Sequence, residues 1–294
     1  MTLFLRSSTP RSQYDAVSEG SSALVIRAYS SSFGLASRLL AEPVRTHVRN
    51  VYALVRVADE IVDNPDPGLA RDTRDTMLTW LQEDVRQALR SGYSANLVVH
   101  AFARTAAVSG IADEIVAPFF ASMRMDLDTT EHTPDSFERY VYGSAEVVGL
   151  MCLRVFLAAP DGPPDPAAAY ERLAPGARHL GAAFQKLNFL RDLAEDHGVL
   201  HRDYFPGLDV DRIDDADRDR ILDDIDRDLA AAAAVVPELP ASSRRAVHAA
   251  HATFTELAAR LRATPAEEIV RRRVRVPGPV KLRLAAGALR GGRS

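Results

Sequence analysis

Apolar residues recur at helical steps of three and four along most of the chain, and no run alternates apolar and polar residues as a half-buried strand would. This pattern predicts helices over residues 16–40, 42–63, 69–90, 94–108, 111–126, 135–158, 167–199, 211–235, 241–262 and 279–290. Proline and glycine cluster at the breaks, and no break is long enough to be a flexible linker. The sequence therefore predicts a single all-α domain over residues 1–294, with 1–20 and 285–294 as the segments that could lack order.

Composition narrows the class of protein. A net charge of -4 over 294 residues argues against a nucleic-acid partner, because nucleic-acid binding needs a broad basic surface. The single cysteine, Cys152, excludes an internal disulfide and is typical of a reducing compartment. No secretory signal is evident, and the most apolar stretch, 147–159, is shorter than the about 20 residues that span a bilayer. We expect a cytoplasmic protein that could be peripheral to the inner face of the membrane.

Two segments of the predicted helices contain Asp-x-x-x-Asp, which places both carboxylates on one helix face. The first pair is Asp59 and Asp63, and the second is Asp192 and Asp196. The spacing alone is weak evidence, because the same spacing recurs within residues 209–228. There the acids alternate with arginines in a pattern typical of a solvated acidic face.

The two pairs differ from that background in their surroundings. Polar residues extend the first stripe backwards at steps of three or four through Arg56, Tyr52, Arg49 and Arg45, and the second through Asn188 and Gln185. Apolar residues flank both stripes, so we expect them to face an internal cavity. Magnesium shared with a substrate phosphate would compensate the buried carboxylates, and arginines suit phosphate oxygens. The alternative is an internal salt-bridge network that holds no ligand.

Five stretches resemble the motifs of the squalene and phytoene synthase family in their expected order. Tyr-Ala-x-x-Arg-x-x-Asp-Glu-x-x-Asp (52–63) and Gln-x-x-Asn-x-x-Arg-Asp-x-x-Glu-Asp (185–196) are similar to its two signature segments. Residues 30–33, 140–149 and 202–206 are similar to its serine-rich, central and Arg-x-Tyr-Leu-Pro segments. The resemblance covers roughly residues 25 to 285, and Gly143-Ser144-Ala145 is similar to the central segment of bacterial phytoene synthases.

This resemblance implies an all-α isoprenoid synthase fold with helices around a central cavity. It implies that Asp59, Asp63, Asp192 and Asp196 are the metal ligands and, with Tyr52 and Tyr204, the catalytic residues. The implied diphosphate contacts are Ser30, Arg45, Arg56, Gln185, Asn188, Arg191 and Arg273. The implied hydrocarbon channel contains Phe33, Tyr142, Gly143 and Val148.

The resemblance also implies a reaction. Two molecules of geranylgeranyl diphosphate would condense head to head to phytoene, through the cyclopropylcarbinyl intermediate prephytoene diphosphate, in carotenoid biosynthesis. Mg²⁺ is the expected cofactor, with Mn²⁺ as the alternative, and NADPH is not expected because no Gly-x-Gly-x-x-Gly follows a strand.

Other activities remain open from the sequence. The same motifs occur in squalene, dehydrosqualene and presqualene diphosphate synthases, which use farnesyl diphosphate. A non-catalytic relative that serves as an assembly or lipid-binding factor is disfavoured, because all four acids are present.

The C-terminal segment is strongly basic. From Ile269 onward it contains arginines and one lysine but no acid, with leucines among them. Most of these charges are expected to be solvated, and Arg273 is the one that the family resemblance assigns to diphosphate. The remainder could form a weak peripheral contact with anionic lipid.

Overall fold

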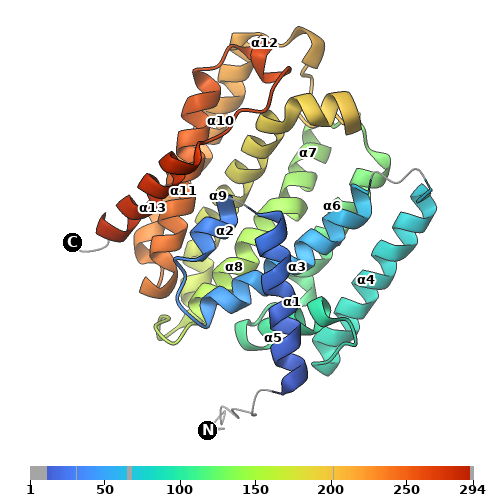
Figure 1. Ribbon diagram of the computed structural model, residues 1–294, viewed down its shortest axis with the longest axis vertical. Coiled ribbons are helices and arrows are strands. Elements are labelled where there is room, and N and C mark those ends of the chain that lie inside the picture. The colour runs from blue at the N-terminus through green and yellow to red at the C-terminus, as the bar shows by residue number, and fades with distance from the viewer. Residues whose placement is uncertain (1–11, 31, 65–67, 201, 292–294) are drawn as a thin grey trace.

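The computed structural model describes residues 12–30, 32–64, 68–200 and 202–291, and within them it contains helices and no β-strand (Figure 1). The α-helices are α1 (Gln13–Tyr29), α2 (Ser32–Ser37), α3 (Val44–Val62), α4 (Arg71–Ser91), α5 (Leu97–Ser109), α6 (Asp113–Asp128), α7 (Pro134–Val141), α8 (Val147–Leu157), α9 (Pro166–Glu195), α10 (Asp215–Val235), α11 (Ala241–Arg262), α12 (Ala266–Ile269) and α13 (Gly278–Gly291). Two π-helical turns, η1 (Tyr142–Glu146) and η2 (Asp196–Leu200), and two short 3-10 turns, η3 (Val210–Arg212) and η4 (Val236–Glu238), complete the order. The predicted all-α class is confirmed.

The helix boundaries differ from the prediction in three places. The helix expected at 16–40 breaks at Ser30, whose backbone is extended while its N–H still donates to the carbonyl of Ile26. The helix expected at 135–158 contains the π-helical turn η1, and α12 was not predicted. Residues 13–20 and 285–291, for which order was in doubt, belong to α1 and α13.

Helix α9 lies at the centre of the arrangement. It packs against α8 and η1 on one side and against α10 and α11 on the other. Helix α3 is enclosed by α1, α4, α5, α6 and α8, and α13 packs on α11. In Figure 1 the early helices α1 and α3 to α6 and the late helices α10 to α13 lie on opposite sides of α8 and α9, while α2 packs against α11.

Two glycines allow the central helices to touch backbone to backbone. A Cβ atom on Gly149 of α8 would lie 2.5 Å from the carbonyl oxygen of Ala177 on α9. A Cβ atom on Gly181 of α9 would lie 2.5 Å from the carbonyl oxygen of Ala145 in η1. Only glycine fits at these contacts, so the two residues fix how closely α8 and η1 approach α9.

The continuous helical stretch Pro134–Leu157 is long and apolar enough to cross a membrane by composition alone, but 56% of its apolar window is buried inside the protein. It packs against α3, α6 and α9. These contacts identify it as a core helix.

One expectation about the acidic segment 209–228 is wrong. Lys186 of α9 donates to Asp224 and, over 2.8 Å, to Asp228 of α10, and His179 lies 2.7 Å from the same Asp228. Asp228 is consequently buried. The acids of this helix that face α9 serve as ion-pair partners, and only the rest form a solvated face.

Candidate active site

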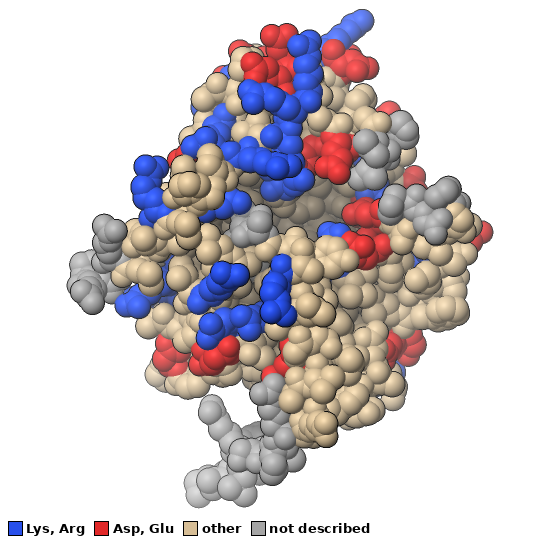
Figure 2. Space-filling model, in the orientation of Figure 1, with Lys and Arg blue, Asp and Glu red and all other residues tan. Residues whose placement is uncertain are grey.

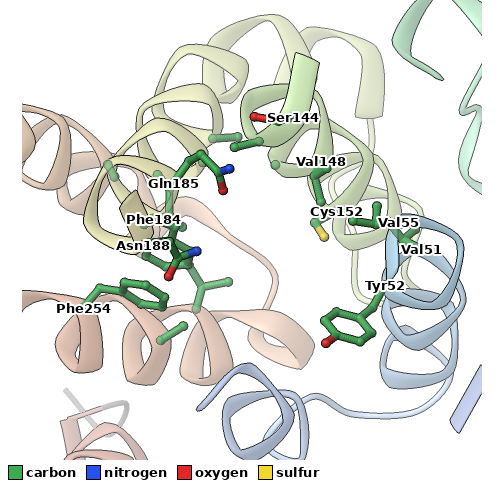
Figure 3. A pocket seen from close by; sticks show the side chains of 18 of the residues that line it. Val51, Tyr52, Val55, Ser144, Val148, Cys152, Phe184, Gln185, Asn188 and Phe254 are labelled. Atoms are coloured by element: carbon green, nitrogen blue, oxygen red, sulfur yellow. The ribbon is translucent and has the colours of Figure 1, made fainter. Parts of the chain in front are cut away.

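A cavity of about 460 Å³ lies between α3, α8, α9 and α11, with further contributions from α2, α6, α10 and the turn η1. Acids and their partners gather at one end of it, around Asp59, Asp63, Asp126, Asp192 and Asp196. The rest of its wall is mostly apolar. In Figure 3, Tyr52 points into the cavity from α3, while Gln185, Asn188 and Phe254 face it from the opposite side.

The acidic end forms where three helices terminate. Asp63 is the C-cap of α3, Asp196 is the C-cap of α9, and Asp126 lies in the last turn of α6. The C-terminal end of a helix carries a partial negative charge, which disfavours a carboxylate at that position. The fold therefore brings several negative charges together at places where the backbone adds to their repulsion.

Burial and this repulsion together raise the pKa values of three carboxyl groups in the cluster. Burial, followed by the charge of Asp63, raises the pKa of Asp59 to about 8. Burial also raises the pKa of Asp126 to about 7, and burial with the neighbouring Asp192 raises that of Asp196 to about 7. Near neutral pH these acids hold protons unless a cation compensates their charge.

Arg202 is the main counter-charge that the chain itself provides. Its guanidinium donates to Asp63 Oδ1 over 2.7 Å and to the carbonyl oxygens of Val62 and Asp126 over 3.4 Å and 2.9 Å. These carbonyls belong to the last turns of α3 and α6. One buried arginine therefore caps two helix ends and holds them together.

Two tyrosines complete this network. Tyr140 donates to Asp126 Oδ2 over 2.8 Å, and Tyr204 donates to Asp126 Oδ1 over 3.2 Å. Burial and the charge of Asp126 raise the pKa of both phenols, so they remain protonated donors. Asp126 is thus fixed by hydrogen bonds to both of its oxygens.

Asp192 is compensated differently. Arg191 donates to it from the adjacent position, with Nε 2.8 Å from Oδ1. Arg273, which precedes α13, reaches it from the far end of the chain with Nε 2.7 Å from Oδ1. Both arginines also line a second space, so they can contact either the acid or a ligand beside it.

That second space, of about 620 Å³, is here named the basic cleft, and it is lined by Arg27, Ala28, Tyr29, Ser30, Arg191, Thr253, Phe254, Leu257, Arg273, Val274, Arg275, Val276 and Lys281. Arg191 and Phe254 line both the cleft and the cavity, so the two spaces adjoin. Burial, with repulsion from Arg191 and Arg275, lowers the pKa of Lys281. In Figure 2, basic side chains lie above and to the left of the hollow on this face, and acidic ones lie at its right rim.

The donor set fits a magnesium ion that is shared with a ligand. Among the described residues, no three side chains of His, Cys, Asp or Glu lie close enough to hold one ion by themselves. Magnesium at phosphate sites normally takes one or two carboxylates and completes its shell with water and phosphate oxygens. Two pairs of carboxylates beside a basic cleft provide those conditions.

The family assignment follows from comparison with known proteins. The model of the squalene/phytoene synthase family matches residues 26–279. The chain belongs to the squalene/phytoene synthase family. It is 28% identical over 285 residues to a phytoene synthase of Mycobacterium bovis, a match that covers 90% of this chain and 88% of the relative. It is 30% identical over 174 residues to the presqualene diphosphate synthase of Rhodopseudomonas palustris, covering 58% of this chain and 57% of that enzyme.

A solved structure supports the fold. The crystal structure of a dehydrosqualene synthase in complex with a ligand superposes with a TM-score of 0.80 at 20% sequence identity, covering 96% of this chain and 98% of that one. At this identity the likeness establishes the fold alone. The predicted isoprenoid synthase fold is thereby confirmed.

Most of the residues that the sequence predicted for the site of this family member do meet in the structure. The cavity is lined by Tyr52, Asp59, Asp63, Val148, Gln185, Asn188, Arg191, Asp192, Asp196 and Tyr204. Ser30 and Arg273 line the adjoining basic cleft. Phe33 lies in α2, but its side chain is outside the described residues.

Two of the predicted diphosphate contacts do not line either space. Arg45 pairs with Glu42, with Nε 2.8 Å from Oε1, on the first turn of α3. Arg56 pairs with Glu60 and stacks over the ring of Tyr29, 4.5 Å from its centroid. Each guanidinium is held by a carboxylate within one helical turn, which the stripe alone did not reveal.

Two of the predicted channel residues are also placed elsewhere. Gly143 faces α6, where a Cβ atom would lie 2.2 Å from the carbonyl oxygen of Pro118, and Tyr142 packs beside Arg178. The reason is the π-helical turn η1, which inserts an extra residue and rotates the faces of the helix. Ser144 and Ala145 consequently line the cavity in their place.

Three site residues were missed by the sequence analysis: Asp126, Tyr140 and Arg202. The signal for Asp126 was present, because it continues the buried face of α6 through Val116, Phe119 and Met123. An acid at a core position of an amphipathic helix needs a partner. Arg202 and Tyr140 begin matched segments, but nothing local indicated that they bind the same acid.

The raised pKa values predict how the stability of the metal-free protein depends on pH. In the unfolded chain an aspartate titrates near 3.9, so the folded protein binds protons more tightly between about pH 4 and pH 8. The stability that these groups contribute is complete below the unfolded pKa and is lost as pH rises through about 7 to 8. Asp59→Asn removes one such group. In EDTA this variant should melt at a higher temperature than the parent at pH 8, with the difference shrinking as the pH falls and vanishing towards about pH 4. A difference that grows at low pH would contradict this.

Arg202 provides a second prediction. Arg202→Ala should destabilise the protein by roughly 3 kcal/mol, because it leaves buried acids and two helix ends without their counter-charge. Arg212→Ala is the matched control, since that side chain is 86% exposed and lies 3.8 Å from its partner Asp209. Urea unfolding at pH 7.5 compares them. Equal free energies of unfolding for the two variants would show that Arg202 does not hold the helix ends.

Proposed function

We propose that this family member joins two molecules of geranylgeranyl diphosphate head to head to form phytoene, through prephytoene diphosphate, in carotenoid biosynthesis. The proposal includes Mg²⁺, or Mn²⁺ in its place, and no NADPH. The observation that carries it is the junction of a carboxylate cluster, a basic cleft and an apolar cavity at Arg191. A prenyl diphosphate has a matching polar head and apolar tail.

The polar residues would bind the two diphosphates. Asp59 with Asp63 and Asp192 with Asp196 would hold the metal, which when bound would neutralise the diphosphate leaving group. Arg191 and Arg273 now compensate Asp192, so a cation there would free both guanidinium groups for phosphate oxygens. Lys281 and Ser30 lie in the same cleft.

The apolar wall would protect the cationic intermediates. Breaking the allylic C–O bond of one substrate leaves a cation that the double bond of the second attacks, and loss of a proton closes the cyclopropane ring. The second diphosphate then leaves, the carbon skeleton rearranges, and loss of another proton gives the product. Val148, Cys152, Phe156 and Phe184 line the route. These side chains exclude water that would react with a cation. The thiol of Cys152 is the one nucleophile among these four side chains, and burial raises its pKa to about 12, so it stays protonated near neutral pH.

The length of the cavity supports a C20 substrate. Cavity-lining residues follow one face of α9 from Asp192 back to Leu173, a rise of about 28 Å at about 1.5 Å per residue. Three successive carbon–carbon bonds along the main chain of a prenyl tail advance about 3.6 Å, as three bonds of an extended peptide backbone do. An extended C20 tail therefore spans about 18 Å and a C15 tail about 13 Å. The diphosphate adds to both. A C20 substrate would therefore extend about 5 Å further towards the deep end at Leu173 than a C15 substrate and would fill more of the apolar wall.

The relatives support the same class of reaction. The Mycobacterium bovis relative is a phytoene synthase, and the Rhodopseudomonas palustris relative is a presqualene diphosphate synthase. Condensation of farnesyl diphosphate is therefore the second candidate. We further propose that the enzyme works in the cytoplasm and touches the membrane through the basic C-terminal segment around α13.

Loss of one metal ligand from each pair tests the reaction. Asp59→Asn or Asp192→Asn should lower turnover with geranylgeranyl diphosphate and Mg²⁺ by about a thousandfold or more, without unfolding the protein. Asp223→Asn on the solvated face of α10 is the matched control, because Arg262, its partner, also pairs with Asp226. Near-normal turnover in either folded site variant would exclude the proposed metal site.

Substrate competition tests the chain length. With C15 and C20 diphosphates present together, and without NADPH, mass spectrometry should detect phytoene as the main product. Ala177→Phe fills the cavity about 22 Å along α9 from Asp192 and should shift the products towards C30 hydrocarbons or their diphosphate precursors. Glu171→Phe, on the exposed face of the same helix, is the control. A preference of the parent for farnesyl diphosphate would favour the second candidate.

A further inference from the structure

Helix α1 has its polarity reversed. Its buried residues are Asp15, Ser18, Ser22 and Ile26, which are mostly polar. Its outward face carries Val17 and Leu24, which are 49% and 58% exposed, followed by the exposed Ala28. These three residues are separated by seven and four positions, so they form one stripe along the helix. A surface helix normally turns such a stripe towards the core.

The buried side of α1 is nonetheless stably packed, which makes the reversal a fixed feature of the fold. Asp15 lies 2.8 Å from His100 Nε2 and also caps the helix start with Ser12. The His100 hydrogen bond is the largest cause that lowers the pKa of Asp15 to about 2. Rotation of α1 to bury Leu24 would break this hydrogen bond, so the apolar stripe faces outwards.

Exposed apolar side chains also occur on α13. Leu282 and Leu289 are 60% and 45% exposed, and their spacing of seven places them on one face. Of the eight large apolar side chains that are exposed among the described residues, five lie on α1 or α13. Single exposed apolar residues are ordinary, but this concentration on two helices is not.

The two helices flank the entrance to the basic cleft. Arg27 at the end of α1 and Lys281 at the start of α13 both line it. Neither these residues nor Arg275 and Arg283 pair with an acid within the part of the chain that the structure describes. Figure 2 shows this face: the surface over α1 is nearly free of charged side chains, and basic side chains gather around the hollow beside it.

We propose that α1 and α13 form a membrane-docking face, which seats the mouth of the basic cleft on an anionic bilayer. Val17, Leu24, Leu282 and Leu289 enter the interfacial layer, and the unpaired cations beside them contact lipid phosphates. A second copy of the chain fits less well, because it would bring like charges together. The purpose of the docking rests on the proposed function, since the substrate tail and the hydrocarbon product both partition into lipid.

The test uses the full chain and vesicles of phosphatidylcholine with or without phosphatidylglycerol at low ionic strength. Val17→Glu/Leu24→Glu and, separately, Leu282→Glu should reduce co-sedimentation with anionic vesicles by about tenfold. Trp80→Glu is the matched control, because Trp80 is 69% exposed on α4, which packs against α3, α5 and α6 and away from this face. It should bind vesicles like the parent.

Activity measurements separate docking from catalysis. With substrate dispersed in detergent, all of these variants should keep the turnover of the parent, whereas vesicle-embedded substrate should be used about tenfold more slowly by the α1 and α13 variants. Failure of the parent to bind anionic vesicles, or an equal loss in the Trp80 variant, would overturn the docking face. So would a dimer in solution that the same α1 and α13 variants dissociate. If the parent binds vesicles but makes no product in detergent, the docking face stands and the proposed function is wrong.

Discussion

The repulsion among carboxylates at three converging helix ends is the constraint on which the rest of the site depends. Asp59, Asp63, Asp126 and Asp196 lie where α3, α6 and α9 terminate, so the backbone dipoles add to the negative potential. A fold that only maximised its stability would not gather acids there. Arg202 compensates part of the charge by capping α3 and α6, and burial together with the remaining repulsion raises the pKa values of Asp59, Asp126 and Asp196. The residual negative potential would favour a divalent cation at this site, as the proposed function requires.

The remaining features of the site complement this potential. The basic cleft offers positive charge that would suit an anionic ligand, and Arg191 joins the cleft to the acidic end of the cavity. The close backbone contacts at Gly149 and Gly181 bring α8 and η1 against α9, so the cavity remains narrow and apolar along the length of α9. Charge is thereby confined to one end, where in the proposed function it would bind the head of an amphipathic substrate while the tail extends away from it.

The sequence predicted what depends on local helical spacing and missed what depends on tertiary contacts. The stripes of Asp59 with Asp63 and Asp192 with Asp196 were predictable, because residues four positions apart on a helix share a face. Gly143 was misplaced because the π-helical turn η1 alters that spacing. Arg45 was misplaced because its guanidinium pairs with Glu42, one helical turn away, and does not face the cavity. The basic cleft joins residues 27–30 to residues 273–281, and no local pattern indicates such a contact between distant segments. Asp126 could have been found from its register on the buried face of α6.

We propose that the carboxylate cluster binds a divalent cation together with diphosphate. Calorimetric titration of inorganic diphosphate into the metal-free protein, with and without Mg²⁺, measures this directly and needs no turnover. Mg²⁺ should tighten diphosphate binding by at least about tenfold. Asp59→Asn should abolish the effect of Mg²⁺, while the basic cleft retains a weak affinity for the anion. Equal affinity for diphosphate with and without Mg²⁺ in the parent protein would contradict it.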